Sequence, residues 1–536
     1  MSESGRELAA LIKVLEKELA PLQRAANEAD WQLNVTGEKH WEEESARLQT
    51  EIRSVLSRPE PYRVLRQAAE SDGVDPLLHR QAVVLANEHA PNQIPKETIE
   101  RMVRLESSLT AQFSRFRAEL DGESLSENRI REILETSENL EERRRTWEAS
   151  KQIGAEVESE LLELVQVRNG AARDLGYRNY YSMMLELDEL DEGEVFALLD
   201  RVVEGTQGSF ERYKHELDGE VAARFGIEAR ELRPWHYADP FFQQPPATGL
   251  DLDPWFDGRS VEELGTSFFS AVGFDVRPIL SRSDLYEREG KCQHAFCMDI
   301  DRRGDIRVLC NLRSNEFWTG VLLHELGHAV YDMSIDPGLP YFLRTQAHIF
   351  VTEASAMLFG RLTRSGAWLT RYVDMPADEA QANEAAVGKA GRARLLHLAR
   401  WVPVMAHLER ALYDDPAQDL NGLWWELVER FQLLRRPDDR DAPDWAAKIH
   451  FSVAPAYYQN YLLGEVTASL FQAHLLDLLG GGAEASQRFV ESAEVGRFLA
   501  DEVYRLGGSK DWRDVIATAT GRPLDPEPFI AELAAS

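Results

Sequence analysis

The chain is poor in cysteine, in basic residues and in long apolar runs. It has three cysteines in 536 residues, too few for a disulfide framework and typical of the reducing cytoplasm. Lys and Arg total 60 against 92 Asp and Glu, and this formal charge of −32 argues against nucleic acid or an anionic membrane as a partner. No apolar run is long enough to span a membrane, and the first residues lack the pattern of a signal peptide. We therefore expect a cytoplasmic protein that binds neither nucleic acid nor membrane; the sequence leaves its oligomeric state open.

Glycine and proline are scarce over the first part of the chain. From Glu7 to about Glu231 the apolar residues recur with a helical period, in long stretches with few breaks. A strand-like pattern occurs at residues 294–301 and 306–312, on either side of a turn that contains Gly304. The pattern is helical again beyond residue 314. The sequence therefore predicts a mostly α fold with a small β-hairpin.

The most informative motif is His324-Glu-Leu-Gly-His328, an H-E-x-x-H pattern inside an apolar run. We expect this run to be a helix that begins near residue 314 or 315 and ends before 337. Positions i and i+4 of a helix share one face, so the two imidazoles point together and make half of a tetrahedral zinc site. Glu325 can then reach a water molecule at the open position of the metal. The alternative is two histidines that happen to lie four apart in a buried helix.

The third ligand is expected to be Glu353, which lies 25 residues after the second histidine in an otherwise apolar segment. A buried carboxylate needs a partner because an unpaired buried charge is costly, and zinc is such a partner. Arg344 or Arg361 could instead pair with this carboxylate, and His348 is a rival ligand. We predict one zinc ion per chain, held by the two motif histidines and Glu353, with water as the fourth ligand.

With this motif, the hairpin and the downstream glutamate, the chain resembles the gluzincin peptidases of the angiotensin-converting-enzyme (peptidyl-dipeptidase A) type. It is more distantly similar to thimet oligopeptidase and oligoendopeptidase. Further segments that carry the resemblance are 31–36, 340–344, 424–427, 447–450, 507–512 and 520–524. The resemblance implies an elongated, neurolysin-like helical peptidase body with a deep channel. The whole chain, 1–536, would be a single zinc peptidase unit, with lid-forming helices in 1–150 and the catalytic part in 230–536.

The resemblance also implies roles for residues beyond the zinc ligands. Tyr461 corresponds to the tyrosine that donates to the oxyanion, and His450 to the histidine that stabilises the transition state. Glu325 would be the general base that takes a proton from the water and passes it to the leaving amine. Simple packing on an amphipathic helix face is the alternative for Tyr461 and for its neighbour Tyr458.

Substrate-binding positions follow from the same resemblance. His294 and Ala295 match the strand that binds the substrate, and Lys448 and Tyr458 match two of three residues that hold a terminal carboxylate. The third, a glutamine, has no counterpart at residues 235–237, where the family pattern expects it.

Other positions depart from the family. Val428 and Asn460 replace chloride-binding arginines, so we expect no chloride activation. Met357 replaces an aspartate one turn past the third ligand, which leaves the partner of one zinc histidine unassigned. Cys292 and Cys310 fall where the family has a disulfide, and we expect them to be thiols facing each other across the hairpin.

The function that these features predict is zinc-dependent hydrolysis of peptide bonds in short peptides, as a dipeptidyl carboxypeptidase or an oligopeptidase. The alternative is a catalytically silent, zinc-containing binding protein with the same fold. A purely structural zinc site usually has four protein ligands, and no fourth candidate is evident. A silent protein would also have no use for a base at Glu325.

Overall fold

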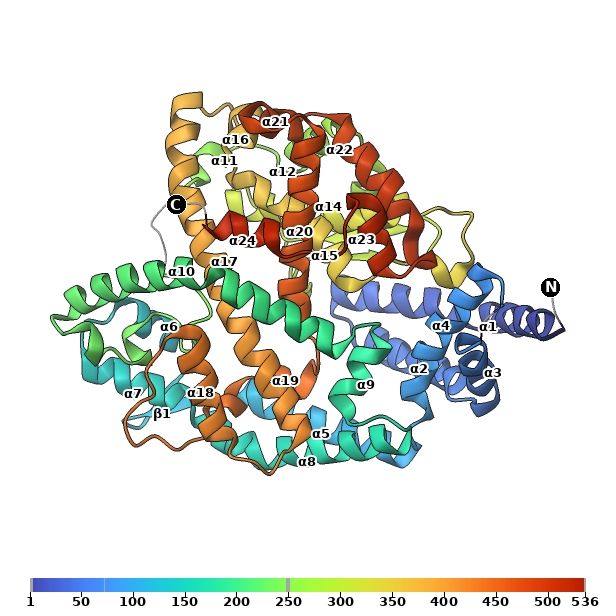
Figure 1. Ribbon diagram of the computed structural model, residues 1–536, viewed down its shortest axis with the longest axis horizontal. Helices are drawn as coiled ribbons and strands as arrows, with labels where there is room; N and C mark the ends of the chain where they lie inside the picture. Colours follow the sequence, from blue (N-terminus) through green and yellow to red (C-terminus); the bar gives the residue numbers. More distant parts are fainter. Residues whose placement is uncertain (1–2, 72, 247–250, 535–536) are drawn as a thin grey trace. The chain divides into compact units, whose positions relative to one another are not determined.

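The computed structural model describes residues 3–71, 73–246 and 251–534. Within these ranges the fold is mostly α with two two-stranded sheets, which confirms the predicted fold class (Figure 1). None of the helices in these ranges combines the length and the apolar character that a membrane crossing requires. The chain divides into two compact units: unit 1 comprises Met1–Gln93, Leu250–Val387 and Leu463–Phe529, and unit 2 comprises Ile94–Gly249, Gly388–Leu462 and Ile530–Ser536.

The elements of unit 1 come from its three chain segments. The first contributes α1 (Glu3–Thr36), α2 (Lys39–Leu56), α3 (Pro59–Ala69), α4 (Pro76–His89) and η1 (Ala90–Gln93). The second contributes α11 (Asp253–Phe256), α12 (Val261–Ala271), α13 (Arg277–Leu280), β3 (Phe296–Asp299), β4 (Ile306–Leu309), α14 (Glu316–Ser334), η4 (Tyr341–Leu343), α15 (Ile349–Gly360), η5 (Arg361–Arg364) and α16 (Gly366–Tyr372). The third contributes α21 (Gly482–Phe489), α22 (Ala493–Phe498), the π-helical turn η7 (Leu499–Val503), η8 (Tyr504–Ser509) and α23 (Trp512–Thr520).

Unit 2 is built in the same way. Its elements are α5 (Lys96–Arg115), β1 (Ala118–Leu120), β2 (Glu123–Leu125), α6 (Glu127–Thr136), α7 (Leu140–Ser150), α8 (Gln152–Asp174), α9 (Tyr180–Leu187), α10 (Glu192–Phe225), η2 (Ala229–Glu231), η3 (Pro234–His236), α18 (Leu420–Gln432), η6 (Asp444–Ala447) and α19 (His450–Val453). Three helices, α17 (Ala377–Asp414), α20 (Gln459–Leu478) and α24 (Glu527–Ala534), contribute residues to both units. The predicted lid segment, 1–150, is therefore shared between the units, and its role as a lid stays a prediction.

Helix α14 carries the H-E-x-x-H motif and begins where the sequence predicts. The side chain of Asn315 caps its first turn by accepting a hydrogen bond from the backbone N–H of Trp318 at 2.9 Å. An accepting side chain at this position satisfies a backbone donor that has no partner inside the helix. The helix ends at Ser334, just before Pro337. Its apolar residues are buried on several faces, as expected for a helix in a protein core.

Helices α14 and α15 lie side by side in unit 1 at very short range (Figure 1). A Cβ atom added to Gly327 would lie 2.7 Å from the Cα of Ala356, and one added to Gly360 would lie 3.0 Å from the Cβ of His324. The hydroxyl of Ser355 also donates a 3.0 Å hydrogen bond to the carbonyl of Gly327. The backbone of α15 is therefore pressed against the turn of α14 that carries the motif.

The predicted hairpin forms from β3 and β4, which pair antiparallel with Cys297 opposite Val308. Helix α1 holds one side of it: Asn27 donates to the carbonyls of Asp299 and Ile300 at 3.2 Å each. The ring of Trp31 also packs edge-on against Phe296. The hairpin is thus a fixed part of unit 1.

A second hairpin, β1–β2, was not predicted from the sequence. Its strands have three residues each and are joined by Asp121 and Gly122, with φ of 55° and 81°. Positive φ at both central residues is typical of the two-residue hairpin turn that Asp-Gly favours. The Asp-Gly pair was the available signal, but the flanking strands are too short to show a clear alternation.

The close contact between α14 and α15 makes a first prediction. We expect Gly327→Ala to destabilise the protein by about 1–3 kcal/mol, because the added methyl group meets backbone atoms that cannot move aside easily. Thermal unfolding measures this as a lower Tm. Gly219→Ala is the matched control, because nothing lies within 4 Å of a Cβ at this exposed site in α10. The control should gain up to about 1 kcal/mol from helix propensity; equal Tm values for both variants would contradict the tight contact.

Candidate functional site

The three predicted metal ligands come together on α14 and α15. Their ligand atoms all lie within 4.8 Å of one another. The Nε2 atoms of His324 and His328 lie 3.8 Å and 3.9 Å from the two carboxylate oxygens of Glu353. A tetrahedral zinc ion with bonds of about 2.0–2.1 Å separates its ligand atoms by roughly 3.4 Å, so a small contraction would complete the site.

Burial keeps the two histidines in the neutral form that a metal needs. It lowers the pKa of His324 to about 4 and that of His328 to about 3, so both imidazoles are neutral at neutral pH. Burial and the nearby charge of Glu465 raise the pKa of Glu353, since a second negative charge is unfavourable there. Two neutral imidazoles and one carboxylate are a donor set that fits Zn²⁺.

The described contacts of His348 and Arg344 are with groups other than Glu353. His348 caps the start of α15: its Nδ1 accepts from the N–H of Phe350 at 3.2 Å, and its ring packs on that phenyl ring. Arg344 donates to the carbonyl of Leu339 at 2.7 Å. The described contacts of Glu353 are instead with the two motif histidines.

One partner of the metal ligands was missed by sequence reasoning. The Nδ1 atom of His328 lies 2.8 Å from the hydroxyl of Thr352, the residue that precedes Glu353. The residue one turn later, Met357, lies against Gly464 of α20 together with Glu353. A threonine in an apolar helix gives no distinctive sequence signal, so its role was visible only in three dimensions.

Glu325 is held next to the predicted metal ligands by the hairpin. Its side chain is buried, and its carboxylate accepts a hydrogen bond from the backbone N–H of Cys297 in β3. Burial and the charge of Glu353 raise the pKa of Glu325 to about 8. His294 is exposed and Ala295 half-buried, and both lie in the segment that leads into β3.

A second group of predicted residues lies in unit 2. The rings of His450 and Tyr458 are 4.9 Å apart, and those of Tyr458 and Tyr461 are 5.4 Å apart. The hydroxyl of Tyr458 accepts from the indole N–H of Trp401 at 2.7 Å. Burial lowers the pKa of His450 to about 4 and raises that of Tyr458 to about 12, so both are neutral near pH 7.

The loop between His450 and these tyrosines has an uncommon backbone conformation. Ala456 adopts φ of 55°, a left-handed conformation that is uncommon outside glycine. Its backbone N–H donates a 2.9 Å hydrogen bond to the buried carboxylate of Glu409. Arg168 donates to the carbonyls of Phe451 and Ser452 at 3.1 Å and 2.6 Å. Buried polar groups therefore fix this loop.

Residues 235–237 contain no glutamine, but Lys448 has a glutamine neighbour elsewhere in the same segment. The Nζ atom of Lys448 lies 3.1 Å from the side-chain oxygen of Gln243, in the loop that follows the expected position at residues 235–237. Phe241 and Trp401 flank the ammonium group, with ring centroids at 4.7 Å and 5.1 Å. The irregular segment that contains Gln243 has no periodic pattern, so its alignment to a motif could not be fixed from sequence.

The three cysteines are free thiols. Cys310 is buried, whereas Cys292 lies outside the paired strands. The expectation that these two face each other stays a prediction.

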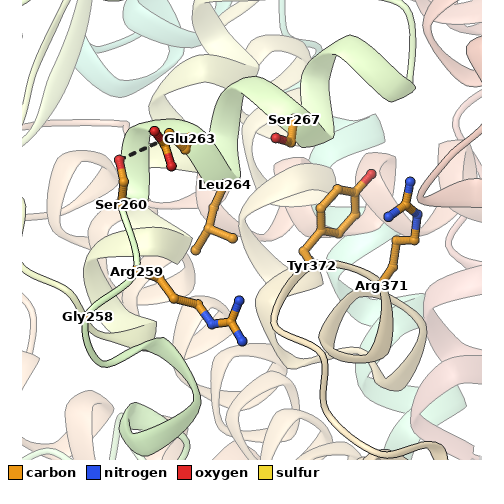
Figure 2. Close-up of a pocket in the computed structure, with 8 residues that line it drawn as sticks. All are labelled: Gly258, Arg259, Ser260, Glu263, Leu264, Ser267, Arg371 and Tyr372. Atoms are coloured by element: carbon orange, nitrogen blue, oxygen red, sulfur yellow. Dashed lines mark hydrogen bonds between the residues drawn. The ribbon is translucent and has the colours of Figure 1, made fainter.

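A separate cavity of about 440 Å³ lies in unit 1 at the start of α12. Figure 2 shows Arg259 and Arg371 among the residues that line it. Arg259 donates to the carbonyl of Val373 at 2.7 Å, and Arg371 pairs with Glu491 at 3.4 Å. None of the predicted site residues lines this cavity, and its arginines already have partners.

The predicted site residues thus form two groups. Unit 1 contains His294, Ala295, His324, Glu325, His328 and Glu353, and unit 2 contains Lys448, His450, Tyr458 and Tyr461. The first group has the chemistry of a metal site with an adjacent base. The second offers a cation, an imidazole and phenols.

Comparisons with known proteins agree with this chemistry. Residues 280–535 match Peptidase family M3, and residues 2–207 match Angiotensin-converting enzyme. The chain is also 23% identical over 313 residues to Carboxypeptidase 1 of Bacillus subtilis (strain 168). That match covers 53% of this chain and 60% of the relative's length. The chain is therefore related to the gluzincin metallopeptidases, through both the M3 peptidases and the angiotensin-converting-enzyme family.

Proposed function

We propose that the protein is a zinc peptidase that hydrolyses peptide bonds in short peptides. The observation that carries this proposal is the cluster of His324, His328 and Glu353, with the buried carboxylate of Glu325 beside it. These residues lie in the part of the chain that matches the M3 peptidases. Zinc bound there would polarise the peptide carbonyl and lower the pKa of a water molecule.

The remaining chemistry belongs to side chains of this protein. Glu325 takes a proton from the attacking water and passes it to the leaving amine. Tyr461 and His450 donate hydrogen bonds to the carbonyl oxygen as negative charge develops on it. The Cys297 N–H holds Glu325 in place, so the base is positioned before substrate arrives.

Lys448, Gln243 and Tyr458 support recognition of a free C-terminal carboxylate. Lys448 is only 9% exposed, and among the described residues it forms no ion pair with a carboxylate. The carboxylates of Asp239 and Glu127 attract it only at longer range, so a ligand carboxylate could make the direct contact. Gln243 supplies the directional partner that a single lysine lacks. We therefore propose carboxypeptidase-type cleavage, with release of dipeptides, over internal cleavage.

The metal ligands are tested by removing the third one. We expect Glu353→Ala to lose most of its bound zinc, because two imidazoles alone hold the ion weakly. Metal analysis of the purified protein measures zinc per chain. His348→Ala is the control: it removes a buried histidine that caps α15 and should leave the zinc content unchanged. Full zinc content in Glu353→Ala would show that Glu353 is not the third ligand. Loss of zinc in the control would point to His348 as a ligand instead.

The base is tested by Glu325→Gln. This variant should retain its zinc and its fold but lose about 10²–10⁴-fold or more in kcat, because an amide cannot accept the proton. Cleavage of a fluorogenic short peptide gives kcat, and metal analysis of the same sample gives zinc content. If wild-type protein binds zinc yet cleaves no peptide, the silent binding protein is the correct interpretation. Near-normal turnover by the variant would remove Glu325 from the mechanism.

The preference for a free C-terminus is tested with one peptide made as the acid and as the amide. We expect the enzyme to release dipeptides from the acid. The variants Lys448→Met and Gln243→Leu should raise KM for the acid and leave KM for the amide nearly unchanged.

The same interaction predicts a dependence on pH. Burial lowers the pKa of Lys448 to about 8, so its charge is present below that pH and is lost above it. KM for the acid should therefore rise as pH increases past about 8. Mass spectrometry of the products decides the matter: equal internal cleavage of acid and amide would contradict C-terminal recognition.

A further inference from the structure

The hydroxyl of Thr352 bonds to a different kind of group from the hydroxyls of four other buried threonines that lie inside helices of this protein. Threonines inside helices usually bond back to the carbonyl four residues earlier. Four buried helical threonines here do so at 2.6–2.8 Å: Thr206 to Val202, Thr319 to Asn315, Thr467 to Leu463 and Thr520 to Ile516. The hydroxyl of Thr352, which is 3% exposed, instead lies 2.8 Å from Nδ1 of His328 on another helix.

We propose that Thr352 is the positioning residue for His328, in the place where metal-binding histidines commonly have a carboxylate or a carbonyl partner. The proposal rests on the proposed zinc site. A histidine that binds metal through Nε2 must carry its proton on Nδ1, and a hydrogen-bond acceptor at Nδ1 favours this tautomer and fixes the ring. The hydroxyl oxygen of Thr352 is such an acceptor.

The surroundings hold Thr352 in register with the ring. Ser355 lies three residues after Thr352 on α15. Its hydroxyl donates a 3.0 Å hydrogen bond to the carbonyl of Gly327, in the turn that leads into His328. The hydroxyl of Tyr504 lies 2.6 Å from that of Ser355, and its ring stacks on Tyr331 of α14 at 4.5 Å. Two hydroxyls of α15, three residues apart, therefore fix the side chain and the backbone of the same turn of α14.

A hydroxyl differs from a carboxylate in a way that matters for the metal. A carboxylate only accepts hydrogen bonds, whereas a hydroxyl accepts or donates. It also adds no negative charge to a site that already contains Glu325, Glu353 and Glu465. Thr352 thus orients His328 without increasing the repulsion between these carboxylates.

The test is zinc affinity of the full-length protein, measured by competition with a chelator. Thr352→Val keeps the shape of the side chain and removes the acceptor, and we expect about 10–100-fold weaker zinc binding. Thr352→Ser restores the hydroxyl and should bind zinc within a few-fold of wild type. Thr319→Val is the matched control, because that buried hydroxyl bonds only to its own helix on α14 and its loss should leave zinc affinity unchanged.

The outcomes separate this inference from the proposed function. If Thr352→Val binds zinc as tightly as wild type, the positioning role is overturned. It is also overturned if Thr352→Ser or Thr319→Val weakens zinc binding as much as Thr352→Val does. In those cases zinc binding by wild type and its loss in Glu353→Ala would leave the proposed function intact. Failure of wild-type protein to bind zinc would overturn both. The absorption spectrum of the Co²⁺-substituted protein gives a second readout, since a reoriented His328 changes the coordination geometry.

Discussion

The close approach of α14 and α15 is the constraint on which the proposed metal site depends. Gly327 has no side chain, so the backbone of Ala356 can lie where a Cβ would otherwise stand. That short distance lets one carboxylate reach two imidazoles at 3.8 Å and 3.9 Å. Buried leucines of α14 supply apolar burial, but the glycine sets the separation of the helices. The Gly within the motif is therefore as much a part of the site as the histidines.

Burial and charge act together at this site. Excluding water lowers the pKa values of both histidines and raises those of Glu325 and Glu353. Each shift removes charge, because an isolated buried charge is costly. A divalent cation reverses this cost for the carboxylates while it uses the neutral imidazoles as they are. The same burial that packs the core thus prepares the donors for a metal.

Local rules predicted the parts of the site that depend on local geometry. The two histidines could be placed on one face because helical periodicity fixes it, and Glu353 was found because a charge in an apolar helix needs a partner. Gln243 was missed because it lies in an irregular loop, where no period fixes the register. Thr352 was missed because a hydroxyl in a helix usually bonds its own backbone. Contacts between distant segments, made by common side chains, leave no pattern in the sequence.

Unit 1 is made of three separate segments of the chain, and this order affects how the protein folds while the ribosome makes it. Unit 1 takes its last large segment from residues Leu463–Phe529, which include the Gly464 that packs on Glu353. Ribosomes make about 5–20 residues per second, so the roughly 110 residues between Glu353 and Gly464 take on the order of 5–20 s to appear. During that interval the side chains of Glu353 and Met357 lack their contact with Gly464. We expect the nascent chain to need protection from aggregation at this stage, and the metal ligands to be assembled only late in translation.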